Sequence, residues 1–144
     1  MKTSTFVGNL IFWIAIAAVC GVFAAWYYTT DVATVTAAAA ESSWTLVGTI
    51  AATPLLLYAI GAIIGLVIIK IGKFRINQSL KSHAFIVASL ILALMIAGIA
   101  PVIALGPTSG YSMPTLLLSY AGVYAAPVFL IIGAAYSVGI APAK

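Results

Sequence analysis

Four long apolar runs without a charged side chain divide this sequence, and they restrict its possible folds more than any other feature. The runs cover residues 7–28, 44–69, 84–105 and 114–138, and every Asp, Glu, Lys and Arg lies outside them. Each run is longer than the ~20 residues that an α-helix needs to cross about 30 Å of hydrocarbon. The sequence therefore predicts an all-α integral membrane protein, a single domain of residues 1–144 with four transmembrane helices.

Composition excludes a soluble domain. Charged residues make up 6% of the chain and hydrophobic residues 65%, whereas about 25% of the residues of an ordinary soluble domain are charged. So few charges cannot solvate the surface of a compact domain of this length. We therefore expect a membrane location, either in a cell membrane or in the lipid-containing shell of a virion.

The basic residues predict the orientation of the chain, because short cytoplasmic loops accumulate Lys and Arg. Segment 70–81 contains four of the six basic residues, and segment 29–43 contains both acidic residues and no basic one. We expect segment 70–81 to lie inside and segment 29–43 outside. Both termini then lie inside, and the four helices form two helical hairpins joined by a basic inner loop.

The basic loop is also a candidate binding surface for anions, through Lys70, Lys73, Arg75 and Lys81. Three interpretations are open. The loop can be an ordinary positive-inside anchor, or it can bind anionic lipid headgroups, at about 1 kcal/mol per basic residue near the membrane surface. The third is contact with nucleic acid beneath a membrane or a virion shell.

Small residues in the second and fourth runs predict close helix packing. Gly61 and Gly65 form a Gly-x-x-x-Gly pattern, and Gly122 and Ala126 repeat the same spacing. Small residues four positions apart allow two helix backbones to approach closely in a membrane. We expect these residues to pack helices, either within the four-helix domain or against another subunit.

A proline and three tyrosines interrupt the otherwise apolar, regular pattern of the runs. Pro127 lies deep in the fourth run, where its missing amide hydrogen can kink the helix. The hydroxyl groups of Tyr58, Tyr120 and Tyr124 also lie inside runs. They can form hydrogen bonds between helices, or they can line a small polar site within the membrane.

No constellation of residues indicates an enzyme. The chain contains one histidine, His83, and one cysteine, Cys20. Proton relays and ion-coupled carriers use charged groups within the membrane, and the four runs contain none. We expect no catalytic residues, no cofactor and no metal.

These observations predict a non-catalytic structural or accessory subunit of a larger membrane-associated assembly. Its partners would be the lipid bilayer and either other membrane subunits or copies of itself. Two kinds of subunit fit these observations. One is an accessory subunit of a membrane complex, and the other is a self-assembling coat or filament protein of a virus-like particle. The two-hairpin layout with a basic inner loop resembles, in layout alone, that of the hydrophobic coat proteins of spindle-shaped archaeal viruses. The alternative function is a small transporter or pore with a site near the Pro127 kink.

Overall fold

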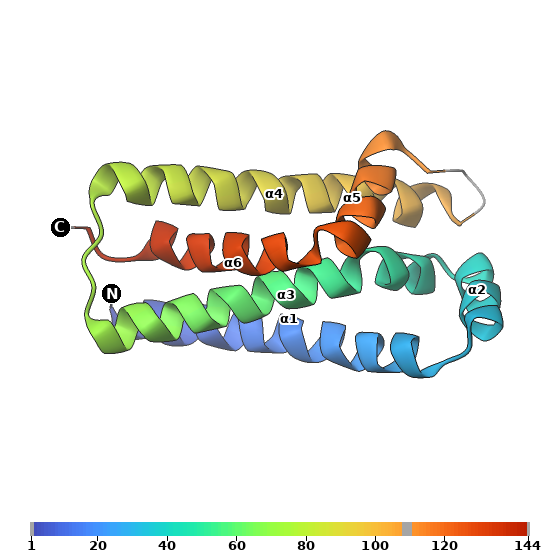
Figure 1. The fold of residues 1–144 in the computed structure, drawn as a ribbon, viewed down its shortest axis with the longest axis horizontal. Coiled ribbons are helices and arrows are strands. Elements are labelled where there is room, and N and C mark those ends of the chain that lie inside the picture. The colour runs from blue at the N-terminus through green and yellow to red at the C-terminus, as the bar shows by residue number, and fades with distance from the viewer. Residues whose placement is uncertain (1, 108–110, 144) are drawn as a thin grey trace.

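The computed structural model describes residues 2–107 and 111–143, which form α-helices and contain no β-strand. The prediction of an all-α chain is thereby confirmed. In chain order the helices are α1 (Thr3–Thr29), α2 (Val32–Glu41), α3 (Ser43–Gly72), α4 (Gln78–Leu105), α5 (Met113–Tyr124) and α6 (Ala126–Ile140) (Figure 1).

Three of these helices, α1, α3 and α4, are long and apolar enough to cross a membrane. They contain the first three predicted runs, and each helix begins before its run does. Their length and composition fit a membrane location. The pair α5 and α6 makes a fourth crossing only if the two helices together count as one span.

The fourth run is not the single helix that the sequence predicts. The helices α5 and α6 meet at Ala125 and are bent by 100° relative to each other. Pro127 gives the physical reason, because it has no amide hydrogen to donate to the Val123 carbonyl and its ring crowds that turn of helix. Ala125, with φ −124° and ψ 21°, lies between the two helices.

Segment 29–43, predicted as an outer loop, contains the short helix α2. Asp31 caps this helix: its carboxylate accepts hydrogen bonds from the backbone N–H of Thr34 at 2.9 Å and from the Thr34 hydroxyl at 2.6 Å. The hydroxyl and backbone hydrogen bonds from Thr34 hold the pKa of the Asp31 carboxyl below its ordinary value.

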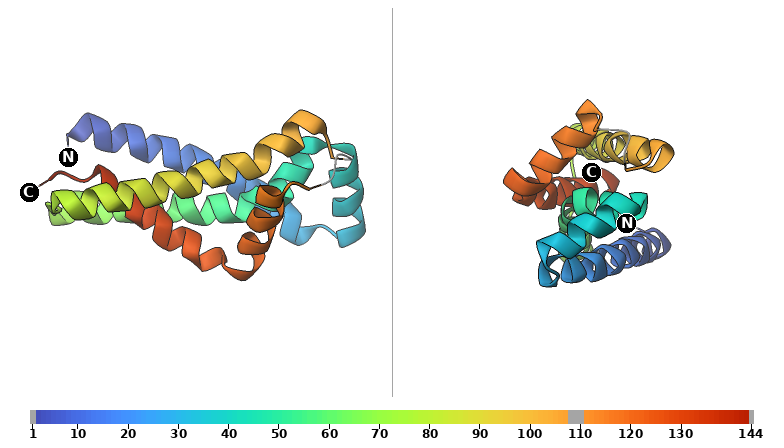
Figure 2. Two further views of the ribbon diagram at one scale, coloured as in Figure 1. Left: turned by 90° about the horizontal axis from the view of Figure 1, so that it is seen from above. Right: turned by 90° about the vertical axis from the view of Figure 1, so that its right-hand side faces the viewer.

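Helix α3 is the centre of the bundle. It packs against α1 and α6, and α6 in turn packs against α4 (Figure 1). Figure 2 shows the bundle from above and from one end, with α5 turned away from the line of α6. The largest core side chains come from α1, α3, α4, α5 and α6, and they include Trp13, Tyr58, Leu66, Met95, Leu118 and Phe129.

Both ends of the chain lie at the same end of the bundle as the connection between α3 and α4, and α2 lies at the opposite end (Figure 1). The backbone N–H of Ile76 donates a hydrogen bond of 3.0 Å to the Pro142 carbonyl. Lys70 Nζ lies 3.4 Å from Thr3 Oγ1. The basic segment 70–81 is therefore held against both ends of the chain.

Candidate functional site

The glycines of the second run lie at the contact between α3 and α6. A Cβ atom added to Gly61 would collide with the Leu130 carbonyl, and one added to Gly65 would lie 2.8 Å from Ser137 Cβ. The two backbones can approach this closely only because these positions carry no side chain. In this structure Gly61 and Gly65 therefore pack one helix of the chain against another helix of the same chain.

Two residues of α6 that the sequence analysis did not single out complete this contact. A Cβ atom added to Gly133 would collide with the Tyr58 carbonyl. Ser137 is fully buried, and its hydroxyl donates a hydrogen bond of 2.7 Å to the Ala62 carbonyl. Gly133 and Ser137 are four positions apart, so the small-residue pattern that drew attention to Gly61 and Gly65 also identifies them.

The small residues of the fourth run, Gly122 and Ala126, lie elsewhere. A Cβ atom added to Gly122 would lie 3.1 Å from Pro54 Cγ, so Gly122 allows α5 to approach α3. Ala126 begins α6 and lines a cavity beside Pro54. They therefore lie where α5 and the start of α6 face α3, away from the contact that Gly61 and Gly65 make.

The three tyrosines are not brought together. Tyr58 is fully buried; its hydroxyl donates a 3.3 Å hydrogen bond to the Ala88 carbonyl, and its ring centroid lies 5.1 Å from that of Trp13. Tyr120 and Tyr124 are 63% and 82% exposed on α5. Their rings stack on each other, with centroids 6.3 Å apart. Tyr58 thus joins α3 to α4, whereas the other two face away from the bundle.

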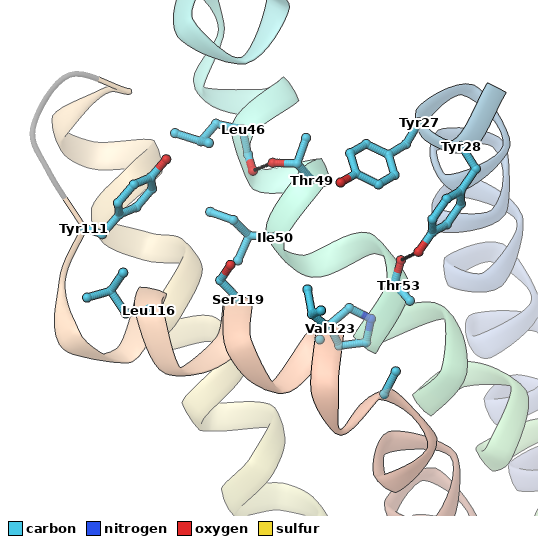
Figure 3. Close-up of a pocket in the computed structure, with 13 residues that line it drawn as sticks. Tyr27, Tyr28, Leu46, Thr49, Ile50, Thr53, Tyr111, Leu116, Ser119 and Val123 are labelled. Atoms are coloured by element: carbon cyan, nitrogen blue, oxygen red, sulfur yellow. Dashed lines mark hydrogen bonds between the residues drawn. The ribbon is translucent and has the colours of Figure 1, made fainter. Parts of the chain in front are cut away.

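A cavity of about 570 Å³ lies between the end of α1, the first half of α3, and α5 (Figure 3). Its volume is within the range of small-molecule sites. None of its lining residues is Asp, Glu, Lys, Arg or His. Hydroxyl groups line it from several elements of the fold, namely those of Tyr27, Tyr28, Thr49, Thr53, Tyr111 and Ser119.

Only some of these hydroxyl groups are paired within the protein. The Tyr28 and Thr53 hydroxyls lie 3.2 Å apart, and Thr49 Oγ1 donates a hydrogen bond of 2.7 Å to the Leu46 carbonyl. Within the described part of the chain, the hydroxyl groups of Tyr27 and Ser119 have no hydrogen-bond partner. They are available to a polar ligand or to water.

Two prolines remove backbone amide donors beside the same cavity. Pro54 in α3 cannot donate to the Ile50 carbonyl, and Pro127 in α6 cannot donate to the Val123 carbonyl. Both Ile50 and Val123 line the cavity. Irregular backbone within a membrane is tolerated where it is buried in protein or lines a water-filled cavity. The break between α5 and α6 therefore coincides with this cavity.

A small polar site near Pro127 is the alternative that the sequence predicts, but with Tyr58, Tyr120 and Tyr124 as its lining, and none of the three lines this cavity. Part of the signal for the observed lining is visible in the sequence. Thr49 and Thr53 are one helical turn apart, and Thr53 immediately precedes Pro54, which places two hydroxyl groups and a proline close together. Ser119 faces these residues because of the bend between α5 and α6. A hydropathy pattern does not predict such a bend. A neighbouring cavity of about 520 Å³ beneath α2 shares Tyr27, Tyr28, Thr49 and Tyr111 with it.

The four predicted anion-binding residues do not all lie at one site in the structure. Lys70, Lys73 and Arg75 line a cavity of about 550 Å³ at the end of α3, and Lys81 does not line it. Lys70 Nζ also lies 5.6 Å from the centroid of the Phe6 ring, within the range of a cation–π contact.

Among the described residues, no group of three or more His, Cys, Asp and Glu side chains is placed to hold a metal ion. No family model matches the chain, and comparisons with curated proteins and with solved structures find no match. The functional interpretation therefore depends on the geometry of this chain.

Proposed function

We propose that the chain is a non-catalytic structural or accessory subunit of a larger membrane-associated assembly. In this proposal the chain crosses the membrane four times, with α5 and α6 as one broken span and both termini inside. Its partners are the lipid bilayer and either other membrane subunits or further copies of the chain. This class includes two roles. The chain can be an accessory subunit of a membrane complex, or a self-assembling coat or filament protein of a virus-like particle.

The observation that carries the proposal is an unpartnered face of α5. Met113, Leu117, Tyr120 and Tyr124 follow the spacing of one helix face, and their exposed fractions are 70%, 62%, 63% and 82%. The bend at Ala125 turns α5 out of the line of α6 (Figure 2). The exposed fractions show that this face of α5 does not pack against the rest of the bundle.

The depth of this face in the membrane favours a protein neighbour over lipid. Gly122 lies beside Pro54 of α3. If about 30 Å of hydrocarbon is centred on α3, Pro54 is about 10 Å below the outer boundary. Lipid tails offer no hydrogen-bond partner to the Tyr120 and Tyr124 hydroxyls at that depth, whereas another helix does.

Native mass spectrometry of the full-length chain, isolated in a mild detergent from the membranes that contain it, tests this proposal. We expect masses larger than a single chain. Leu117→Trp should reduce the assembled fraction, because added bulk prevents protein packing more than lipid contact. The matched control is Val22→Trp on α1, a position that is 75% exposed. A wild-type chain found only as a monomer without partners would overturn the proposal.

A second candidate function, a small transporter or pore, is favoured by the cavity at the break between α5 and α6. Broken helices with exposed backbone groups form the substrate sites of many transporters. The uncharged hydroxyl lining suits a neutral hydroxylated solute. Ser119 and Thr53 replace the three predicted tyrosines as the residues expected to contact that solute, together with the carbonyl groups of Ile50 and Val123.

Light scattering from vesicles that contain the purified chain, after osmotic shock with glycerol or glucose, tests this second function. Transport predicts faster re-swelling than in protein-free vesicles. Ser119→Leu, which narrows the cavity and removes one of its hydroxyl groups, should reduce the difference, and Tyr124→Phe outside the cavity should not. Equal rates with and without the chain would exclude this function for these solutes.

A further inference from the structure

We propose that the cavity at the end of α3 binds the phosphate group of an anionic phospholipid. The cavity has a volume of about 550 Å³, and Lys70, Lys73 and Arg75 line it. This inference is independent of both proposed functions, because it concerns the opposite end of the bundle from α5 and the polar cavity (Figure 1).

The backbone at the end of α3 brings the three cationic side chains together. Lys70 belongs to the last turn of α3, and Lys73 caps the helix with a left-handed conformation, φ 50° and ψ 31°. This conformation reverses the chain and places Arg75 beside the end of the helix. A Cβ atom added to Gly72 would collide with the Phe74 ring, so glycine also allows that ring to fold against the helix.

A segment distant in the sequence completes the cavity. The hydrogen bond from the Ile76 N–H to the Pro142 carbonyl is accompanied by a parallel bridge between Ile76 and Ala143. Pro142 and Ala143 thereby form one wall. The site therefore combines two segments about 70 residues apart in the sequence.

The charge of this end of the bundle favours an anion. The two acidic residues of the chain, Asp31 and Glu41, flank α2 at the opposite end. Lys70, Lys73 and Arg75 therefore make this end of the bundle positive, and an anion bound among them would reduce their mutual repulsion. A phosphate group is well suited, because Arg75 can donate two parallel hydrogen bonds to it and Lys73 can add a further one. The Lys70 amine lies against Thr3 and Phe6 and contributes positive charge nearby.

Two features favour a lipid phosphate over free phosphate. Ile69, Phe74 and Pro142 give the cavity apolar walls, which can contact the glycerol and the first acyl carbons of a lipid. The cavity also lies directly after an apolar helix of membrane-spanning length. This is the level at which phospholipid headgroups lie, and basic residues at that level attract anionic lipids.

Lys81 provides a matched control. It belongs to the same basic segment but lies in the first turn of α4, outside the cavity. An ordinary positive-inside anchor predicts that all four basic residues contribute similarly to the attraction for anionic lipid. The proposed site predicts that substitution of Lys73 or Arg75 weakens lipid binding strongly and that substitution of Lys81 weakens it little.

The experiment is native mass spectrometry of the full-length chain in detergent, titrated with dioleoylphosphatidylglycerol or, for comparison, dioleoylphosphatidylcholine. The wild-type chain should retain one molecule of phosphatidylglycerol in preference to phosphatidylcholine. Arg75→Gln and Lys73→Asn should each weaken its binding about fivefold or more. Asparagine is chosen at Lys73 because it tolerates the left-handed conformation. Lys81→Gln should change binding less than twofold.

Four other outcomes would overturn the proposal. Equal weakening by Arg75→Gln and Lys81→Gln would indicate a general anchor, and equal retention of the two lipids would remove the anion preference. Displacement of the lipid by 10 mM inorganic phosphate would indicate a site for free phosphate. Binding of a single-stranded oligonucleotide with the same variant dependence, and no lipid preference, would indicate nucleic acid. Circular dichroism of each variant verifies that the helical content is unchanged.

Discussion

The Ser137 hydroxyl donates its hydrogen bond to the Ala62 carbonyl across the contact between α3 and α6, at a distance of 2.7 Å. Both residues are fully buried. The bond forms because Gly61 and Gly65 on one helix and Gly133 on the other remove the side chains that would hold the backbones apart. The central contact of the bundle therefore depends on the absence of side chains as much as on their presence.

The first prediction concerns this contact. Gly61→Ala places a methyl group against the Leu130 carbonyl, so the helices must separate. We expect a loss of about 1–3 kcal/mol in the free energy of unfolding, the usual cost of overpacking a core. Denaturation of the purified chain in detergent, followed by circular dichroism, measures it.

Gly8→Ala is the control for Gly61→Ala. Gly8 lies in α1, and an added Cβ atom meets nothing within 4 Å. Alanine is the better helix former by about 0.5–1 kcal/mol, so this variant should be as stable as the wild type or slightly more stable. If both variants lost the same stability, the close approach of α3 and α6 would not be the cause.

The second prediction concerns Tyr58. Tyr58→Phe removes the hydrogen bond to the Ala88 carbonyl and leaves the ring in contact with Trp13. Hydrogen bonds between membrane helices contribute about 0.6 kcal/mol on average, so we expect a loss of that order. Tyr58→Ala should cost several times more, because it also leaves a cavity in the core. Equal losses for the two variants would show that the ring contributes little.

Sequence reasoning predicted α1, α3 and α4 because uninterrupted apolar length is sufficient to predict a membrane helix. It placed Pro127 at a kink, but it treated residues 114–138 as one helix, since a hydropathy pattern is unchanged by a bend. The Gly61 and Gly65 pattern predicted close packing and left the partner helix open. A polar site near Pro127 was predicted, but its lining residues were not, because they depend on which faces of α3 and α5 meet, and that depends on the bend.

The third prediction concerns α2 and pH. The pKa of the Asp31 carboxyl is lowered in the folded chain because Thr34 donates hydrogen bonds to the carboxylate. A lowered pKa means that the cap stabilises α2 above the unfolded pKa and that this stabilisation is lost as the pH falls through the folded value. Amide hydrogen exchange of residues 32–36 should therefore accelerate at acid pH relative to that of α1. Asp31→Asn, which caps without ionising, should remove most of this pH dependence.

The fourth prediction concerns the break between α5 and α6. Pro127→Ala restores the amide hydrogen that can bond to the Val123 carbonyl, so we expect the two helices to straighten and the polar cavity to change shape. Spin labels at Leu117 and Ile131, both exposed, report this as a longer distance, measured in a Cys20→Ala background. Pro101→Ala is the control, because α4 continues through Pro101 without interruption. An unchanged distance in Pro127→Ala would show that packing of α5 against α3 and α4, and not the missing amide hydrogen, maintains the bend.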